Sequence, residues 1–179
     1  WNLARLAEAM LPLLDPDSHR AVERALPMLA RFADLFEQHW LSGMRSKLGL
    51  FTEEPQDKVL VDDLLAWMQG SAADFTNTFV MLSNAGSLEK MINVNPEFDA
   101  WHRRLQARRA QQPQSASEVE NLMRQHNPAF IPRNHKVEEA LEAATGAHDF
   151  SVMVRLLDVL RTPYQYSRGL PEFSQSRQR

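Results

Sequence analysis

One stretch of the sequence decides the fold class: residues 150–161, which read FSVMVRLLDVLR. Successive residues of an α-helix are rotated by about 100°, so the apolar positions of this stretch fall on two neighbouring faces. The first face holds Phe150, Met153, Val154, Leu157 and Leu160, and the second holds Val152, Leu156 and Val159. A helix that is apolar over most of its circumference lies in a central layer. We therefore expect either that other helices of this chain wrap it, or that one face packs on a part of the protein missing from this chain.

The same helical spacing of apolar residues extends over nearly the whole chain, and no segment alternates strictly between apolar and polar residues. The sequence therefore predicts an all-α fold. A first helix is expected at residues 3–11, where Pro12 ends or kinks it. A second begins near Asp17-Ser18, both good N-caps, and Pro27 divides it from a long third helix at residues 28–48.

Helix starts in the middle of the chain are marked by capping residues and prolines. Thr52, followed by two glutamates and a proline, has the chemistry of a helix start, and Gly70 with Ser71 ends that helix. Asp74 opens a short helix that runs to residue 82, before a break at residues 84–86. Pro96 opens another helix, which fades in the linker-like residues 111–115.

The last third of the chain combines three expected helices with an irregular segment. Ser117 and Glu120 match a capping box for a helix that ends at residue 126. Two prolines give residues 127–133 an extended course, and we expect Arg133 to make a buried or interface ion pair. Asn134 caps a helix that ends at Gly146, and Asp149 caps the helix over residues 150–161. Residues 1–166 are thus predicted to form a helical domain and residues 167–179 a flexible tail.

Composition excludes several kinds of site. The chain has 179 residues, a net charge of -3, no cysteine and 6 glycines. Without cysteine there is no disulfide, no zinc-thiolate site and no thiol nucleophile in this segment, and a reducing compartment is permitted. No glycine-rich phosphate loop is present, and no apolar run approaches the roughly 20 residues of a membrane span. We therefore expect neither a membrane nor a nucleic acid as a partner.

One basic cluster could still bind phosphate or nucleic acid. It consists of His102, Arg103, Arg104, Arg108 and Arg109, beside Trp101. On a helix, Arg104, Arg108 and Arg109 flank the apolar face, where long side chains cover the edge of a core and pair with acids. The structural interpretation is favoured, and salt-dependent binding lost on changing these arginines would support the other.

Acidic and histidine side chains also fail to form a recognisable site. His135 lies one turn from Glu138 and Glu139, and His148 adjoins Asp149, but no histidine pair has metal-binding spacing. The acid pairs Asp62-Asp63 and Glu138-Glu139 are expected on solvated helix faces. We therefore assign no catalytic, no cofactor-binding and no metal-ligating residue to this chain.

Two segments nevertheless resemble a known family. Residues 1–14, WNLARLAEAMLPLL, are similar to the segment that follows the catalytic region in the selenoprotein O family. Residues 127–164, with the pattern N-P-x-x-I-P-R-N-H, then V-E-x-A-x-x-A and a closing L-x-V-L-R-x-P-Y, resemble the C-terminal signature of that family. The middle of the chain matches mainly in its helical pattern and in Asp74-Phe75-Thr76.

The resemblance implies a parent protein with a protein-kinase-like fold, a pseudokinase that transfers AMP from ATP to protein hydroxyl groups with Mg²⁺. This chain would be its helical C-terminal region, and its start at Trp1 instead of a methionine agrees with a piece of a longer protein. The nucleotide-binding and metal-binding residues of the family lie before that start. The implied partners are the upstream catalytic lobe and protein substrates, in a bacterial cytoplasm.

One departure from the family concerns the tail. Many members carry Cys-x-x-Sec or Cys-x-x-Cys near the C-terminus, whereas residues 169–179 contain no sulfur nucleophile. The alternative to a buttress of a catalytic lobe is a free-standing helical module that binds a protein through an exposed apolar patch.

Overall fold

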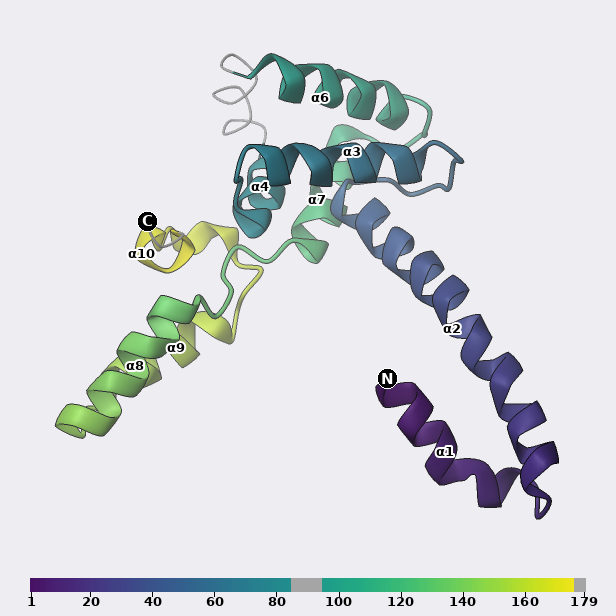
Figure 1. Ribbon diagram of the computed structural model, residues 1–179. Coiled ribbons are helices and arrows are strands. Elements are labelled where there is room, and N and C mark those ends of the chain that lie inside the picture. Colours follow the sequence, from purple (N-terminus) through teal and green to yellow (C-terminus); the bar gives the residue numbers. More distant parts are fainter. Residues whose placement is uncertain (85–94, 176–179) are drawn as a thin grey trace. The chain divides into compact units, whose positions relative to one another are not determined.

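The computed structural model describes residues 1–84 and 95–175, and within these ranges it contains helices and no strand, so the all-α prediction is confirmed. The elements follow one another as α1 (Asn2–Leu14), α2 (Ser18–Lys47), α3 (Asp57–Gly70), α4 (Phe75–Leu82), α6 (Pro96–Arg109), α7 (Ala116–His126), α8 (Asn134–Ala147), α9 (Ser151–Leu160), the 3₁₀ turn η1 (Tyr166–Arg168) and α10 (Pro171–Ser174) (Figure 1).

The chain divides into two compact units, Trp1–Ser42 and Gly43–Arg179. The first unit is a helical hairpin made by α1 and most of α2. Its turn is fixed by Asp17, whose Oδ1 accepts the amides of His19 and Arg20. Only two small apolar side chains of this unit, Ala21 and Ala25, are buried. The hairpin therefore has almost no core of its own among its 42 residues.

Neither proline of this hairpin ends its helix, so the division expected at Pro27 and the helix end offered for Pro12 are wrong, while a kink at Pro12 stays a prediction. Pro12 lies inside α1 and Pro27 lies inside α2, which continues from Ser18 to Lys47. A proline removes one helical hydrogen bond and frees the carbonyl group four residues earlier. Both prolines and the residues with the freed carbonyls, Glu8 and Glu23, are exposed, so water can solvate those carbonyl groups.

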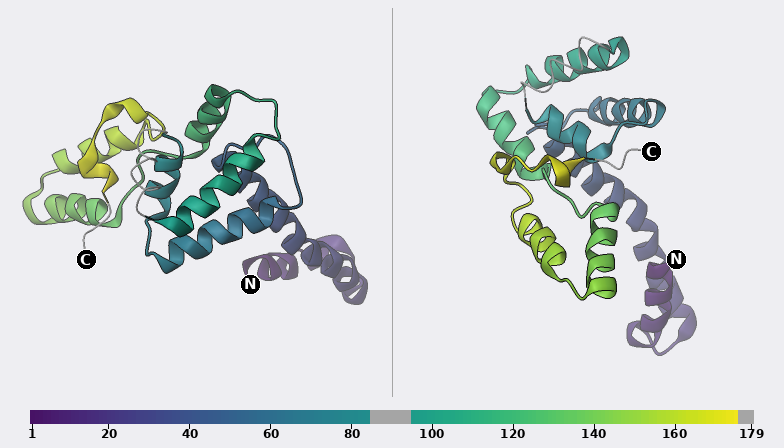
Figure 2. Two further views of the ribbon diagram at one scale, coloured as in Figure 1. Left: turned by 90° about the horizontal axis from the view of Figure 1, so that it is seen from above. Right: turned by 90° about the vertical axis from the view of Figure 1, so that its left-hand side faces the viewer.

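The core of the second unit lies between α3 and α6, which pack side by side (Figure 2). Its centre is aromatic: Phe98 is fully buried and lies between Trp67 and Trp101, with ring centroids 4.6 and 5.5 Å away. The indole Nε1 of Trp101 donates to the Leu60 carbonyl at 2.8 Å. This bond gives the buried indole its polar partner and fixes the register of α6 on α3.

A second apolar cluster joins α8 and α9, which also pack side by side. Its buried members are Ala129, Phe130, Ala140, Leu156, Val159 and Phe173. The irregular segment before α8 is held here as well, because the Ala129 amide donates to the Pro163 carbonyl at 2.8 Å. The second face of the α9 stretch is thus the one that this chain covers.

Several helix ends differ from the sequence prediction. α3 begins at Asp57 instead of at residues 52–55, because Thr52 lies in the preceding loop, where its carbonyl accepts a bond from Arg108. The capping box is formed by Ser115 and Glu118, not by Ser117 and Glu120: Ser115 is extended, whereas Ser117 already lies inside α7.

Both ends of α8 are displaced by one residue from the prediction. The N-cap is Arg133, and Asn134 is the first helical residue. The helix runs past Gly146 to Ala147, and His148 takes the left-handed conformation that a glycine was expected to supply, with φ of 53°. A histidine tolerates this region better than a β-branched residue would. The expected cap of the next helix is also displaced by one residue: Phe150 and not Asp149 is the N-cap of α9, although Asp149 Oδ1 accepts the Ser151 amide at 2.8 Å.

The expected flexible tail contains structure in its described part. Residues 166–175 include η1 and α10, and Phe173 is buried against the α8–α9 cluster. Flexibility of residues 167–179 stays a prediction, and its last four residues lie outside the described ranges. The break expected at residues 84–86 also lies largely outside them.

Candidate functional site

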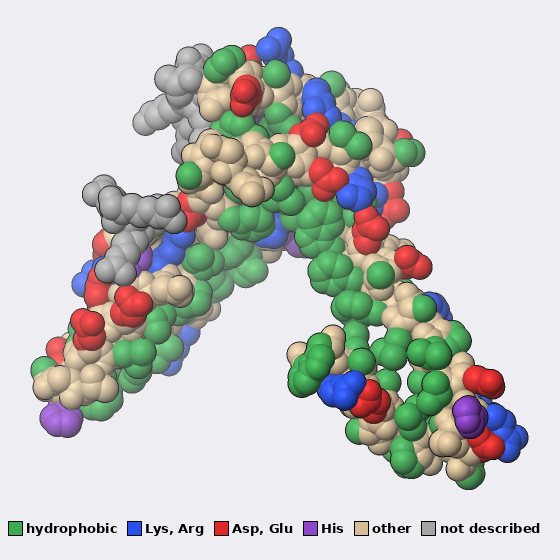
Figure 3. Space-filling view, in the orientation of Figure 1, with side chains coloured by type: hydrophobic (Ala, Val, Ile, Leu, Met, Phe, Trp, Pro, Cys, Tyr) green, Lys and Arg blue, Asp and Glu red, His purple; other side chains and the backbone are tan. Residues whose placement is uncertain are grey.

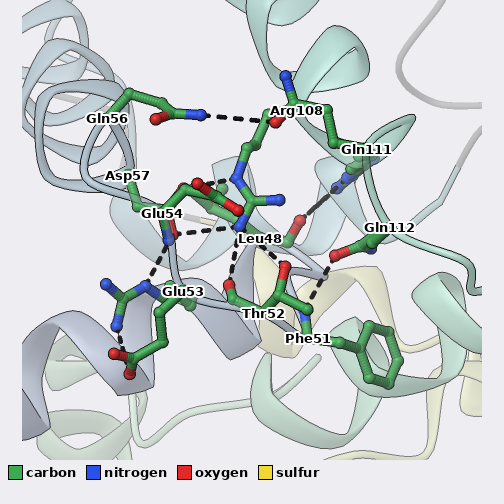
Figure 4. A network of polar contacts seen from close by, with 12 residues as sticks. Leu48, Phe51, Thr52, Glu53, Glu54, Gln56, Asp57, Arg108, Gln111 and Gln112 are labelled. Carbon is green, nitrogen blue, oxygen red and sulfur yellow. Dashed lines mark hydrogen bonds and ion pairs between the residues drawn. The ribbon is translucent and has the colours of Figure 1, made fainter.

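A buried carboxylate, Asp57, organises the most extensive polar network of the second unit (Figure 4). Arg108 donates from Nε to Oδ1 at 2.7 Å, and Arg45 donates from Nε to Oδ2 at 2.8 Å. The amide of Glu54 donates to the same Oδ2 at 2.9 Å. Arg108 also reaches the Thr52 carbonyl through Nη2 at 2.8 Å. One carboxylate thereby joins the end of α2, the following loop, the start of α3 and the end of α6.

The electrostatics of Asp57 oppose a role in proton transfer. Burial raises the pKa of its carboxyl, but the hydrogen bonds from Arg108, from the Glu54 amide and from Arg45 lower it by more. The pKa therefore lies below its usual value of 3.8, and the group is ionised at neutral pH. A general acid needs the opposite shift. The geometry fits a structural ion cluster in which Asp57 is bonded by both arginines, although Nη1 of Arg108 is buried without a hydrogen-bond partner.

Sequence reasoning missed Asp57 as a central residue, although it identified both the acids of this loop and Arg108. The available signal was an acid in the first turn of a helix followed by apolar residues at positions 60, 61 and 64. Such an acid is usually a solvated partner of the helix dipole. Its burial depends on two arginines that lie 12 residues before it and 51 residues after it, and this pairing is a tertiary feature.

The basic cluster on α6 is largely engaged by acids, as the structural interpretation expects. Arg104 pairs with Asp63 at 2.6 Å and Arg103 with Asp99 at 3.0 Å, while Arg108 belongs to the Asp57 network. Arg109 departs from the expectation, because it bonds the Leu48 carbonyl through Nε and Nη2 instead of an acid. The absence of a nucleic-acid partner stays a prediction.

His102 of the same cluster lies in the core instead of on the surface. Its ring is stacked on Phe98 at an interplanar angle of 8°, and its Nε2 lies 2.9 Å from the Gln106 amide nitrogen. Burial lowers the pKa of His102, the positive charge of Arg109 lowers it further, and Asp99 opposes them. The imidazole is therefore neutral at pH 7 and packs as an aromatic side chain.

Arg133 makes the ion pair that the sequence predicts. Its Nη1 and Nη2 donate to the two carboxylate oxygens of Asp74 at 2.5 and 3.0 Å, and Nη2 also reaches Asn77 Oδ1 at 2.9 Å and the Ser174 carbonyl at 3.0 Å. The arginine side chain is 11% exposed. Burial raises the pKa of Asp74, and the bonds from Arg133 and nearby amides lower it by more. Arg133 thus connects the starts of α4 and α8 to α10.

The remaining acids and histidines do not assemble into a metal site within residues 1–84 and 95–175, where no group of three or more potential ligands occurs. Asp62 pairs with Lys58 at 2.8 Å, and Glu139 pairs with Lys136 at 2.7 Å. His148 is exposed at the end of α8. No helix in the described part of the chain is long and apolar enough to cross a membrane.

Uncovered apolar surface occurs in each unit. Hydrophobic side chains gather over the hairpin of α1 and α2 (Figure 3), and a groove of about 690 Å³ runs between these two helices. Leu6, Met10 and Phe32 are among its lining residues and are 56%, 42% and 50% exposed. On α9 and its N-cap, the face that holds Phe150 and Val154 is only partly covered: Phe150 is 54% and Val154 is 60% exposed, whereas Met153 and Leu160 pack against the α8–α9 cluster. Single exposed apolar residues are ordinary, but contiguous patches mark interaction surfaces.

Comparison with known proteins identifies the family. The family model described as protein adenylyltransferase SelO matches residues 1–161. The chain belongs to the SelO family. A protein nucleotidyltransferase YdiU of Halalkalibacterium halodurans is 51% identical over 167 residues, which are 93% of this chain and 34% of that protein. Proteins of the same name from Bacillus cytotoxicus and Syntrophotalea carbinolica are each 47% identical, over 97% and 99% of this chain.

The chain spans about a third of the length of these curated relatives. The match confirms the resemblance that residues 1–14 and 127–164 predicted, and it also includes the middle of the chain, where the resemblance was mainly one of helical pattern. Family membership is therefore established for this segment, while the activity of a whole protein is a separate question.

Proposed function

We propose that this chain is the helical C-terminal part of a protein adenylyltransferase with a protein-kinase-like fold, and that it supports the catalytic lobe without carrying the active site. The family match over residues 1–161 carries the proposal. The relatives are named nucleotidyltransferases and are about three times as long, which leaves room for a catalytic part outside this chain.

In the proposed reaction, the hydroxyl oxygen of a serine, threonine or tyrosine of a protein substrate attacks the α-phosphorus of ATP. A phosphorus–oxygen bond to the substrate forms, the bond to the β-phosphate bridge breaks, pyrophosphate leaves, and the hydroxyl proton passes to a base. Mg²⁺ would supply charge neutralisation at the phosphates. We expect this reaction in a bacterial cytoplasm.

We propose that ATP and Mg²⁺ bind outside this chain, and the pairing of two of its acids supports this. The buried carboxylate Asp57 is held by two arginines and the partly buried Asp74 by a third, so neither presents a free oxygen to a metal. Arg108 is likewise used in the Asp57 network. We therefore derive no catalytic step through this segment and place nucleotide and metal in the part of the parent that lies outside it.

The supporting role is proposed from the uncovered apolar surfaces. Phe150 and Val154 share one face of α9 with Leu157, which is 50% exposed, while the opposite face is buried on α8. A helix with one covered and one open apolar face is suited to lie between two layers. We propose the catalytic lobe as the second layer. The groove between α1 and α2 is a further surface of the same kind.

A chimera tests the proposal. In it, this chain replaces the matching segment of the Halalkalibacterium halodurans relative, and protein labelling with α-³²P-ATP and Mg²⁺ is measured. We expect the chimera to label protein and this chain alone to label none. Replacing both Phe150 and Val154 by Asp should reduce labelling at least about tenfold, since each buried, unpaired carboxylate costs several kcal/mol.

Ser151→Asp is the control, because it adds one such carboxylate, half the charge of the double variant, at an exposed position of the same helix. It should leave labelling unchanged. A folded chimera that labels no protein would contradict the proposed reaction. Full labelling by the Phe150/Val154 double variant would instead remove the docking role of α9 and favour the alternative, a helical module that binds another protein.

A further inference from the structure

Arg109 is a largely buried cation with an unusual set of partners. Its Nε and Nη2 donate to the Leu48 carbonyl at 3.0 and 2.8 Å, and Nη2 lies 2.9 Å from the Met123 sulfur. Its Nη1 makes no hydrogen bond to the described residues, since the bonds of Arg109 run through Nε and Nη2. Burial lowers the pKa of Arg109 to about 10, so the guanidinium keeps its charge at pH 7 with its hydration reduced.

The other well-buried arginines of the second unit differ from Arg109. Arg45 and Arg108 share the carboxylate of Asp57, and Arg133 pairs with Asp74. Arg109 makes no ion pair with the described carboxylates, and its partners are the Leu48 carbonyl and the Met123 sulfur. The carbonyl at the end of α2 compensates part of the charge through its dipole, but a carbonyl provides no full negative charge. The environment of Arg109 is therefore suited to an additional anion.

A pocket of about 380 Å³ has Arg109 among its lining residues. It is formed by the ends of α4 and α6 and the start of α7, and its walls combine apolar and polar side chains. The apolar ones are Leu82, Ala110, Ala116, Val119 and Met123, and the polar ones are Ser83, Gln106, Gln114 and Glu120 beside Arg109. The Oε1 of Gln114 is enclosed without a donor, so a half-turn of its amide would bring the Nε2 donor to that position at little loss.

We propose that this pocket binds a small carboxylate carried on a short apolar stem, with the carboxylate on the free edge of Arg109 and the stem between Val119 and Leu82. A monoanion fits better than a phosphate dianion, because Glu120 also lines the pocket. That glutamate is paired with Arg124 at 2.5 Å, which leaves Arg109 to the ligand. Charge-assisted hydrogen bonds to a partly desolvated guanidinium are about twice as strong as neutral ones.

The site is independent of the proposed enzymatic function, and the 179-residue chain itself serves for the test. The ¹⁵N-NMR signals of Arg109 Nε–H and of the Val119 amide are followed while sodium butyrate, acetate, phosphate or chloride is added at a constant ionic strength of about 0.1 M. We expect saturable shifts with butyrate, weaker binding of acetate because its stem is shorter, and no saturable shift with phosphate or chloride.

Two variants distinguish binding in the pocket from a nonspecific effect of anions, and both keep Arg109 and its bond to Leu48. Ala116→Glu places a carboxylate in the pocket wall and should weaken butyrate binding about tenfold or more by occupying the guanidinium. Ser117→Glu adds the same charge in the same first turn of α7, at an exposed position outside the lining, and should bind butyrate as the unchanged chain does. Equal binding by both variants, identical shifts with butyrate and chloride, or no shift with butyrate would each overturn the proposal.

Discussion

The guanidinium of Arg108 donates from Nε to Oδ1 of Asp57 across 2.7 Å, and both side chains are almost completely removed from solvent, at 3% and 0% exposure. The two residues are 51 positions apart in the chain, at the last turn of α6 and the first residue of α3. Arg45 shares the same carboxylate, so the loss of Asp57 would leave two largely buried arginines without this anion, whereas the loss of Arg108 leaves Asp57 paired with Arg45 alone.

Arg108→Met tests this dependence. The variant keeps much of the volume of the side chain but removes both the charge and the bonds to Asp57 and Thr52. We expect the free energy of unfolding, measured by urea denaturation, to fall by about 2 to 4 kcal/mol, since bonds to charged groups contribute about 1.5 to 3 kcal/mol each. Arg103→Met, at an exposed site on the same helix, should change it by less than about 0.5 kcal/mol. Similar losses in both variants would refute a special role of the Asp57 network.

The pH dependence of stability follows from the lowered pKa values of Asp57 and Asp74. A carboxyl whose pKa is lower in the folded than in the unfolded state stabilises the fold above the unfolded value, here near 3.8. That contribution is lost as the pH falls through the folded-state pKa. Unfolding temperatures measured from pH 7 downward should therefore stay nearly level until about pH 5 and then fall steeply. Asp74→Asn should make the acid-induced fall shallower, and an unchanged profile would contradict the assignment.

Arg133→Ala removes the bidentate ion pair with Asp74 and the hydrogen bond to the Ser174 carbonyl. We expect a loss of about 2 to 3 kcal/mol, since bonds to charged groups contribute about 1.5 to 3 kcal/mol. Amide hydrogen exchange should also become faster in α10, because Arg133 holds the carbonyl end of that helix. Arg133→Lys should restore less than half of the loss, because an ammonium cannot reproduce the planar fork. Unchanged exchange in α10 would show that Phe173 alone holds this segment.

Gly49 occupies a position that other residues cannot take without strain. Its φ is +69°, and a Cβ there would lie 2.6 Å from Val119 Cγ1 and 3.1 Å from Met123 Cγ. Gly49→Ala should therefore destabilise the protein by about 2 kcal/mol or more, from the left-handed conformation and the displaced side chains. Gly43→Ala, inside α2 with nothing within 4 Å, should stabilise it by about 0.5 to 1 kcal/mol. Thermal unfolding of the two variants measures both changes in stability. A stability change of the same sign in Gly49→Ala and Gly43→Ala would contradict the prediction.

The position of the capping box can be tested with two serines. Ser115 accepts the Glu118 amide and Glu118 bonds the Ser115 amide in return, whereas Ser117 lies inside α7. Ser115→Ala should cost about 1 kcal/mol and Ser117→Ala only a few tenths. Both losses are measured by urea denaturation. A larger loss for Ser117→Ala than for Ser115→Ala would support Ser117 as the N-cap of α7, as the sequence predicts.

Capping residues and prolines predicted the positions of several helix starts, because a helix start depends on residues that are close in the sequence. Asp74 and Pro96 begin helices because a capping carboxylate or a proline in the first turn acts within one turn of the chain. The shift of the capping box by two residues has a simple cause, since two serines precede two glutamates with the same spacing. Pro12 and Pro27 failed as helix breakers because exposure, which sequence alone does not give, decides whether a freed carbonyl is tolerated.

The polar networks were only partly predictable for the same reason. The proline segment before Arg133 indicated a fixed position that an ion pair would stabilise, but its partner Asp74 lies 59 residues earlier. Arg109 followed the pattern of its neighbours on α6, yet it faces the end of α2 instead of an acid. Which carboxylate meets which arginine is set by the packing of α3 on α6, and periodicity determines only the face on which each lies.

The sparse interior of the α1–α2 hairpin, where Ala21 and Ala25 are the buried apolar side chains, bears on how this chain behaves on its own in solution. Concentrated solutions of the isolated chain should self-associate through Leu6, Met10 and Phe32, and a newly made chain should be a substrate for chaperones until this surface is covered. Expression yield and colloidal stability of the fragment would then depend on 42 residues that contribute little to its own unfolding free energy.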